Sequence, residues 1–562
     1  MKNYQAPVEE YLKLMKVLGV QHAQYDYDTV AMILQNAAKF VESELQPRNA
    51  KADEQGCTWD QETGEVTLPA GFDELYKQYV EQGYAAMGGK EVYGGTNMPM
   101  VSILAMAEFM AAANMAFSLG PMLTPAATQA IEYAGTEAQK KTYLPKMIRG
   151  DWSGTMCLTE AHCGTDLGLI KTKAQAVDDH YLISGNKIWI TYGEHNLTSN
   201  IIHLVLAKLP DAPKGSKGIS MFIVPKYLEN GEKNKVFCTG LEKKMGQHGS
   251  PTCFMSFDNA KGYLLGEPNQ GLKNMFVMMN EARIGVGVSG LALSEAAYQI
   301  ALAFAKERRQ SRALNSKKSD PTKEADLILV HPDIRRQLLE VKSTNIPMRA
   351  LVVYAGMLGD SAKADDKARL ELLTPIIKSF CSERGVANID TCMQILGGCG
   401  YVKDYNVEQY YRDARISMIY EGTNGIQALD LVGRKLMKDG GNAMRQLIAD
   451  MQQEASGCNN ALYAKGLGDI TNDIKAASMW LMQHAIKDHE QAGAIASAYL
   501  QLVAYGLLAW MWVKMITFDK KAANGVSRYY FTHVLSIRLV LMDNIQKGKE
   551  SITELDDNDF DL

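Results

Sequence analysis

The sequence predicts a mainly α-helical protein with a central β-domain. Three observations predict this class. Apolar residues recur at helical spacing before residue 154, short alternating segments fill residues 154–266, and helical spacing then returns to the end of the chain. A chain of 562 residues is too long for one ordinary domain, and 46% hydrophobic residues suffice for several cores. We therefore expect helical, β, helical-bundle and helical-extension domains in that order.

Residues 1–153 form the expected N-terminal helical domain. The segment TVAMILQNAAKFVESEL at 29–45 has apolar residues at helical spacing, and GTEAQKKTYLPKMIRG at 135–150 reads as a helix closed by Pro145. Between them, GGKEVYGGTNMP is a glycine-rich loop.

Residues 154–266 form the expected β-domain. In HYLISGNKIWIT, apolar and polar residues alternate on both sides of Gly185-Asn186, which predicts a hairpin turning at that pair. The segments NIIHLVLAKL, GISMFIVPK and TCFMSFDNA continue as short strands.

Residues 267–436 form the expected helical bundle, because long helices with one apolar stripe and short loops pack in this way. One such stripe combines Leu293 and Ala297 with Ile300 and Phe304.

Residues 437–562 form the expected helical extension, in which 491–513 is a run of 23 uncharged residues. That length could span a bilayer, but Ser497, Gln501 and Tyr505 recur every four residues and give the run a polar stripe. We favour a buried or interface helix over a single membrane span or a membrane-surface helix.

Charge and cysteine usage exclude several classes. The net charge is −5, and the extension holds 12 basic and 15 acidic residues, a net −3, so nothing indicates a nucleic-acid binder. The nine cysteines form no CxxC pair, which argues against a disulfide framework and a metal site and for a reducing compartment. The N-terminal segment MKNYQAPVEEYLKLM has acidic residues where a signal peptide would be apolar, so we expect no export signal. No GxGxxG follows a strand, so we expect no Rossmann site.

Two segments of the β-domain contain groups suited to a flat ring. MCLTEAHCGTD offers the hydroxyls of Thr159 and Thr165 as hydrogen-bond donors, although an ordinary polar loop has the same composition. In KIWIT, Trp189 and Thr191 leave the same side of a strand, where the indole could cover an aromatic face or simply fill a core.

Three segments of the helical bundle contain further candidates. ERRQSR places Arg308 near a helix end, where it could bind phosphate or be solvated. The glycines of QILGGCGY allow close approach of a ligand or end a helix. In YEGTN, Glu421 could be a turn residue, or a base whose pKa a closed pocket raises.

In this order and spacing, LTEAHCGTD, KIWIT, MNEARIGVG, QILGGCGY and YEGTN resemble the motifs of the FAD-dependent acyl-CoA dehydrogenases over residues 50–436. The extension, with TMCLTEAHCGTDLGL and HLVLAKLPDAPKGSKGIS, is similar to a C-terminally extended subgroup that includes 3-methylmercaptopropionyl-CoA dehydrogenases and long-chain bacterial acyl-CoA dehydrogenases. The resemblance implies a helical N-domain, a β-barrel middle domain and a four-helix-bundle C-domain.

The resemblance also assigns roles to residues. Glu421 matches the family's catalytic base. The positions matching the family's FAD contacts are Leu158, Thr159, Thr165, Trp189, Ile190, Thr191, Arg308, Gln394, Gly397, Gly398, Thr423 and Asn424. Arg308, Gln394, Gly397 and Gly398 would reach the FAD of a neighbouring subunit. The positions matching substrate contacts are Thr165, Asn280, Arg283 and Gly422.

The chain departs from the family pattern at four places. Ala161 replaces a proline after TE, RQSR replaces RQFG beside Arg308, and Gly425 replaces a larger residue. Asn280 stands where some members have aspartate, which puts that substrate contact in doubt.

The implied reaction is α,β-dehydrogenation of an acyl-CoA to a trans-2-enoyl-CoA, in which Glu421 takes the α-proton and flavin N5 takes the β-hydride. The electrons would pass to an electron-transfer flavoprotein. The expected enzyme is a cytoplasmic bacterial homodimer, with peripheral membrane contact through the extension left open. An acyl-CoA oxidase and a DNA-binding flavoprotein on the same scaffold are the alternatives, and the acidic extension argues against the second.

Overall fold

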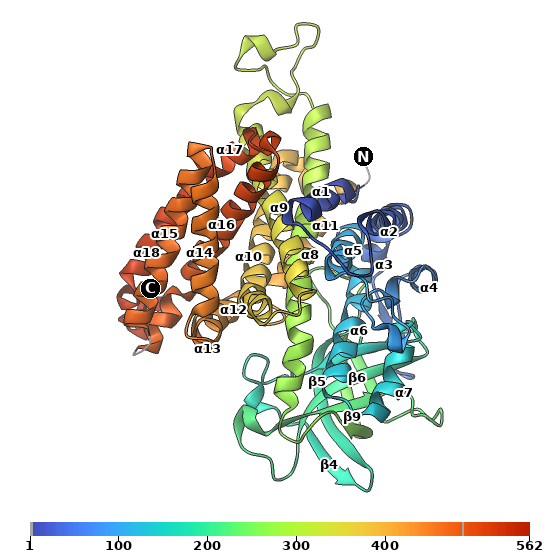
Figure 1. Ribbon diagram of the computed structural model, residues 1–562. Helices are drawn as coiled ribbons and strands as arrows, with labels where there is room; N and C mark the ends of the chain where they lie inside the picture. Colours follow the sequence, from blue (N-terminus) through green and yellow to red (C-terminus); the bar gives the residue numbers. More distant parts are fainter. Residues whose placement is uncertain (1–3, 486–487, 562) are drawn as a thin grey trace. The chain divides into compact units, whose positions relative to one another are not determined.

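A computed structural model describes residues 4–485 and 488–561 (Figure 1). The chain divides into two compact units. One unit comprises residues 36–285, and the other comprises residues 1–35 together with 286–562. Two helices, α2 (Tyr27–Phe40) and α8 (Gly271–Glu307), contribute residues to both units.

The 36–285 unit contains an α-helical layer and a β-domain. Its helices are α3 (Asn49–Gln55), α4 (Phe72–Glu81), α5 (Met100–Ala113), α6 (Met115–Ala134) and α7 (Glu137–Ile148). Its strands are β1 (Thr58–Trp59), β2 (Val66–Thr67), β3 (Trp152–Cys157), β4 (Lys173–Val177), β5 (His180–Thr191), β6 (Asn200–Lys208), β7 (Ile219–Pro225), β8 (Val236–Leu241) and β9 (Thr252–Leu264).

The β-domain closes on itself. Strands β6, β4, β5, β9 and β7 pair in that order, and β7 pairs back with β6, while β3 and β8 add to the outside of this ring. The core lies where α6 and α7 meet β6 and β7, with Ile131, Leu144, Leu204 and Ile223 all buried. The expected barrel is therefore present, and the short β1–β2 pair is an addition to the mostly helical N-terminal region.

The hairpin predicted at Gly185-Asn186 is wrong. Strand β5 runs through both residues, and the turn lies at Asp178-Asp179, between β4 and β5. Gly185 instead allows Thr172 to lie close to strand β5, since a Cβ at Gly185 would lie 2.5 Å from the Thr172 hydroxyl. Alternation of apolar and polar residues continues on both sides of a bulge, so it cannot distinguish one long strand from a hairpin.

The prediction that Pro145 closes its helix is also wrong, because α7 continues to Ile148. The proline lacks an N–H, but Met147 and Ile148 after it are buried, and Gly150 with φ +86° ends the segment.

The second unit is mainly helical and also contains the first part of α2. Its elements besides α8 are α1 (Val8–Leu18), α9 (Pro332–Gly359), α10 (Ala364–Leu396), α11 (Val407–Arg415), α12 (Asn424–Asp430), α13 (Leu436–Lys438), α14 (Asn442–Gly457), α15 (Ala461–His484), α16 (His489–Phe518), α17 (Gly525–Thr532), α18 (Ile537–Lys547) and α19 (Glu550–Thr553). Asn388 on α10 fixes the bundle, because its buried amide donates to Ser294 on α8 and to Asn345 on α9.

Helix α16 contains the uncharged run of the extension and lies between the bundle helices α9, α10 and α12 and the extension helices α14, α15 and α18 (Figure 1). Both α8 and α16 are long and apolar enough to cross a membrane, but most of each apolar window is buried inside the protein. The indole of Trp512 donates to the Ser343 carbonyl of α9 at 3.0 Å. This burial agrees with the favoured interpretation of a core helix.

Candidate functional site

The candidate residues form two groups, one in each unit. The 36–285 unit holds the flavin and substrate candidates Leu158, Thr159, Thr165, Trp189, Ile190, Thr191, Asn280 and Arg283. The helical unit holds Arg308, Gln394, Gly397, Gly398, Glu421, Gly422, Thr423 and Asn424.

Glu421 lies on a strained loop between the end of α11 and the start of α12. Its φ is +57° and that of Gly422 is +83°, so two consecutive residues adopt the left-handed conformation. This conformation is costly for glutamate and persists only where surrounding contacts enforce it. The Glu421 side chain is half-buried. Thr423, and not Glu421, caps α12, so the turn-residue alternative does not explain this conformation, and the role of Glu421 as a base stays a prediction.

Two polar side chains hold the backbone of this loop. The buried Lys378 ammonium donates to the Gly422 carbonyl at 2.7 Å and to Asn424 Oδ1 at 3.0 Å. The buried Gln427 amide donates to the Glu421 carbonyl at 3.0 Å and to the Gly422 carbonyl at 3.3 Å. Thr423 caps α12 by accepting from the Ile426 N–H. These bonds fix the direction in which the loop presents its carboxylate.

The Asn424 side chain is hydrogen-bonded to residues of α10 inside the bundle. Its Nδ2 donates to the Ser379 carbonyl at 3.1 Å, and its amide also exchanges hydrogen bonds with Ser382. The flavin contact assigned to Asn424 stays a prediction, but these bonds give the amide a role in holding the loop.

In the β-domain, the loop after β3 rests on a buried ion pair between Glu160 and Lys187. The Lys187 ammonium donates to Glu160 Oε1 and to the Leu158 carbonyl, both at 2.9 Å. Glu160 also accepts from the Thr172 hydroxyl at 2.6 Å and from two backbone N–H groups. Burial alone would raise the pKa of the Glu160 carboxyl, but the Lys187 charge and these donors lower it to about 2. The pair thus anchors the Leu158 and Thr159 segment.

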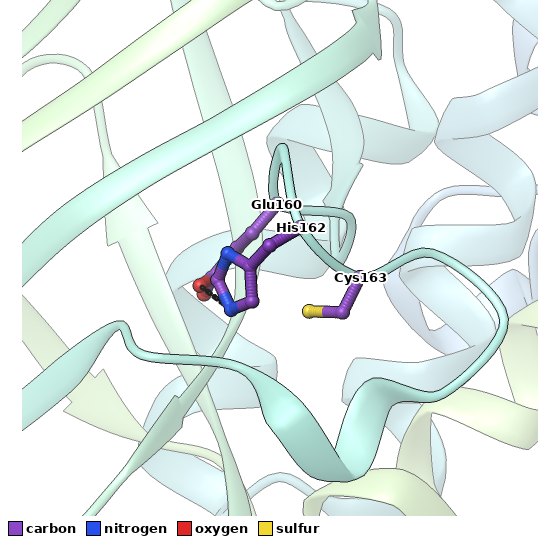
Figure 2. A group of neighbouring side chains, drawn as sticks. All are labelled: Glu160, His162 and Cys163. Carbon is purple, nitrogen blue, oxygen red and sulfur yellow. Dashed lines mark ion pairs between the residues drawn. The ribbon is translucent and has the colours of Figure 1, made fainter.

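Figure 2 shows Glu160 beside His162 and Cys163, three side chains of types that bind metals. Their chemistry does not favour an ion. The Glu160 oxygens already accept from Lys187, Thr172 and the backbone, and His162 Nε2 lies 3.0 Å from the Leu169 carbonyl. Burial and the Glu160 charge raise the pKa of the Cys163 thiol, whereas a metal binds the thiolate.

Trp189 projects from a β-bulge. The pairing of β5 with β9 shifts register between Lys187 and Ile190, and Trp189 takes a φ of +60°. Its side chain is 58% exposed, and its indole N–H donates to Glu242 at 2.8 Å. Ile190 is buried and Thr191 half-buried. The exposure of the indole excludes the core-filling alternative, and the contact of Trp189 with a flat ring stays a prediction.

Arg308 differs from the arginines that follow it. Arg309 pairs with Asp320, and Arg312 donates to Ser319 and to backbone carbonyls of the same loop. Within residues 4–485 and 488–561, Arg308 has no ion-pair partner. Tyr405 lies 5.8 Å, ring to ring, from Phe304 one turn before Arg308, and the pKa of Tyr405 is raised by Cys399 and lowered by the Arg308 charge. Arg308 and the Gly397–Gly400 turn therefore lie close together, as a shared phosphate site would need.

Asn280 and Arg283 lie one turn apart on α8. Arg283 is buried, with its guanidinium 5.6 Å from the Phe276 ring centre, and Asn280 Oδ1 is buried without a hydrogen-bond partner among the described residues. Glu281 lies between them, and burial raises its pKa to about 7.

Comparison with known proteins identifies the family. Acyl-CoA dehydrogenase N-terminal, middle and C-terminal domain profiles match residues 28–151, 155–260 and 269–437, and a profile described as acetyl-CoA dehydrogenase C-terminal like matches 443–556. A 3-methylmercaptopropionyl-CoA dehydrogenase of Ruegeria pomeroyi is 39% identical over 91% of this chain and 90% of its own length. The chain belongs to the acyl-CoA dehydrogenase family.

Two further acyl-CoA dehydrogenases match over nearly the whole chain. A broad-specificity linear acyl-CoA dehydrogenase of Mycobacterium tuberculosis is 32% identical and covers 100% of this chain and 99% of its own length. The structure of an acyl-CoA dehydrogenase complexed with FAD from Bacillus anthracis superposes with a TM-score of 0.75 at 22% identity, covering 100% of this chain and 92% of its own. The extension is thus part of the likeness.

The sequence motifs of the acyl-CoA dehydrogenases did not reveal the residues that hold Glu421. Lys378 lies in the apolar run TPIIKSFCS, and a lysine at a core position of such a run was the available signal. No sequence signal indicated Gln427, because a glutamine one turn into a helix is common. Glu281 stands inside the NEARIG motif but matches no assigned role.

Proposed function

We propose that the protein is an FAD-dependent acyl-CoA dehydrogenase in which Glu421 removes the α-proton of the thioester. The observation that supports this most directly is the loop geometry. Two consecutive left-handed residues are held by Lys378 and Gln427, and the half-buried carboxylate is the group that this arrangement orients. Strain of this kind concentrates at functional sites.

The residues present fit FAD. The exposed Trp189 indole offers a flat face, Arg308 offers a guanidinium with no ion-pair partner in the described chain, and Cβ atoms at Gly397 or Gly398 would meet nothing within 4 Å, which leaves room for a ligand. Trp189, Ile190 and Thr191 would lie against the ring, and Arg308, Gln394, Gly397 and Gly398 would hold an FAD of the neighbouring subunit. When bound, FAD supplies the hydride acceptor.

The remaining chemistry belongs to the chain. The α-proton of a thioester is too weakly acidic for a carboxylate in water, so the site has to stabilise the developing enolate. In the family, the backbone N–H of the catalytic glutamate donates to the thioester oxygen, and a preorganised donor of this kind contributes about 2.7–4 kcal/mol. Expulsion of water on substrate binding would raise the pKa of Glu421 and strengthen it as a base.

The substrate is an acyl-CoA, and the relatives suggest two kinds of acyl group. The Ruegeria relative acts on 3-methylmercaptopropionyl-CoA and the mycobacterial relative on linear acyl-CoAs. We propose a linear acyl or methylthioacyl chain, with Asn280, Arg283, Thr165 and Gly422 as the contacts. We further propose electron delivery to an electron-transfer flavoprotein and a cytoplasmic homodimer, in which each subunit completes the FAD site of the other.

The test uses the purified, FAD-loaded protein under anaerobic conditions. Acyl-CoAs from butyryl-CoA to palmitoyl-CoA, plus the methylthio substrate, are mixed with the wild type and with Glu421→Gln, and bleaching of the flavin absorbance is followed. We expect the wild type to bleach, and the variant to keep its FAD but to bleach about 100- to 10,000-fold more slowly, because a general base is lost.

Glu324→Gln, on an exposed loop, is the matched control and should bleach like the wild type. Fast bleaching by Glu421→Gln would remove Glu421 from its role, and no bleaching of the wild type by any thioester would refute the proposed reaction. Reoxidation by electron-transfer flavoprotein faster than by air separates a dehydrogenase from an oxidase.

A further inference from the structure

The polar stripe of α16 becomes more buried along the helix and reaches the bundle at Gln501 and Tyr505. Ser497 is exposed, Gln501 one turn later is half-buried, and Tyr505 is buried with its ring 4.9 Å from that of Phe380 on α10. The Gln501 amide donates to Glu383 Oε1 of α10 at 2.8 Å. A polar group of the C-terminal extension thus reaches a carboxylate of the domain that holds Glu421.

Glu383 leads directly to the Glu421 loop. Glu383 adjoins Ser382 on α10, whose hydroxyl exchanges hydrogen bonds with the amide of Asn424, the first residue of α12. Burial raises the pKa of the Glu383 carboxyl, and the Asn424 side chain acts in the opposite direction. The same Asn424 amide accepts from Lys378, whose ammonium also holds the Gly422 carbonyl. A set of contacts therefore runs from Gln501 to Glu383, from the adjacent Ser382 to Asn424, and on through Lys378 to the residue that follows Glu421.

Packing adds to this connection. Helix α16 packs against α12 as well as α10, so the helix that begins at Asn424 rests on the extension (Figure 1). The strained backbone at Glu421 and Gly422 has to be enforced by its surroundings. Helix α16 supplies part of those surroundings through its contact with α12.

We propose that Gln501 is a positioning residue for the Glu421 carboxylate, acting through Glu383 and Asn424. The C-terminal extension is then part of the catalytic geometry and not a separate appendage. Gln501 holds this segment of α10 through Glu383, the segment orients the Asn424 amide through Ser382 and Glu383, and Lys378 joins that amide to the Gly422 carbonyl. This inference rests on the proposed role of Glu421 as the base.

The first test compares Gln501→Leu with Ser497→Ala, which lies one turn earlier on the same stripe. Leucine keeps the bulk of glutamine but removes the donor. We expect the rate of flavin bleaching at saturating acyl-CoA to fall about 10-fold, less than the about 100-fold cost of a 1 Å misplacement. The acyl-CoA Kd and the FAD content should stay within about 2-fold of the wild-type values, and Ser497→Ala should be unchanged.

A second readout does not depend on turnover. Hydrogen–deuterium exchange of the peptide 416–427 should be faster in Gln501→Leu than in the wild type and in Ser497→Ala. Glu383→Gln, a nearly isosteric change, is the second variant in case Gln501→Leu folds poorly. It should lower the bleaching rate similarly, and the double variant should lose little more than either single variant, because both act through one contact.

Introducing a second carboxylate gives a pH signature. In Gln501→Glu the new side chain faces Glu383, so two like charges repel at neutral pH and share a proton in acid. We expect the bleaching rate relative to the wild type to recover as the pH is lowered, which a merely misfolded variant would not show.

The outcomes separate the two proposals. Wild-type bleaching and exchange in Gln501→Leu would overturn the positioning role while leaving the dehydrogenase reaction intact. Absence of bleaching in the wild type would refute the reaction, and the exchange of peptide 416–427 would still decide whether Gln501 orders the loop. Equal losses in Gln501→Leu and Ser497→Ala would attribute the effect to the stability of α16 alone.

Discussion

Trp189 has an unfavourable left-handed backbone conformation and an exposed indole, and together these give a prediction at the residue scale. If the ring covers the flavin, Trp189→Ala should weaken FAD binding by about 0.5–1.5 kcal/mol, the usual value of an aromatic contact, which is about 2- to 10-fold in Kd. Equilibrium titration of the apoprotein with FAD measures this. Trp189→Phe keeps an aromatic face and should lose less than alanine. Equal Kd values for wild type and Trp189→Ala would show that the bulge serves another purpose.

The residues predicted from sequence and those found only in the structure differ in a physical way. Glu421, Trp189 and Arg308 stand in short motifs whose local composition is unusual. The groups that hold Glu421 in place come from elsewhere, since Lys378 is 44 residues from Gly422, and Gln501 is 118 residues from Glu383. Pairing at such distances depends on helix packing, which periodicity predicts only as a buried face.

At the scale of elements, the interior of the β-domain contains two buried histidines. His195 Nε2 bonds the Ser153 hydroxyl at 2.9 Å, and His203 Nδ1 on β6 bonds that of Thr155 on β3 at 2.8 Å. Burial, and then the nearby Lys226 charge, lower the pKa of each to about 3. Both are therefore neutral in the folded state at pH values where the unfolded chain protonates them.

This difference predicts a loss of stability in acid. Between pH 6.5 and about pH 3 the unfolded state binds more protons, so stability falls as the pH falls, by up to about 1.4 kcal/mol per pH unit for each histidine. His203→Gln can keep the Thr155 bond but does not titrate. Urea unfolding at pH 6 and pH 5 should show a pH slope that is shallower than the wild-type slope by about 1.2 kcal/mol per unit. An unchanged slope in His203→Gln would mean that His203 is charged in the fold.

At the scale of the whole molecule, a buried cation joins the N-terminal helix α1 to the bundle within the helical unit. The Arg349 guanidinium on α9 is fully buried and bonds Glu10 of α1 at 2.6 Å and Glu295 of α8 at 3.3 Å. Nearby, Lys13 of α1 pairs with Asp519, just after α16. The first helix is thus fixed to both the bundle and the extension.

Arg349→Met should destabilise the protein by about 3–5 kcal/mol at pH 7, because Glu295 is left as an uncompensated buried charge. Burial would raise the pKa of Glu295, but the charges of Arg349 and Lys342 lower it to about 2. The ion pair therefore contributes its full stability above the ordinary pKa of a glutamate, and this contribution is lost as the pH falls toward 2. In the variant, burial is the larger influence on the pKa of Glu295, so Glu295 takes up a proton more readily. The loss of unfolding free energy caused by the substitution should therefore be smaller at pH 5 than at pH 7. Chemical denaturation at both pH values measures it, with Glu9→Gln on the exposed face of α1 as the control. An equal penalty at both pH values would show that Arg349 acts by packing, and the charge network would then not be what holds α1 in place.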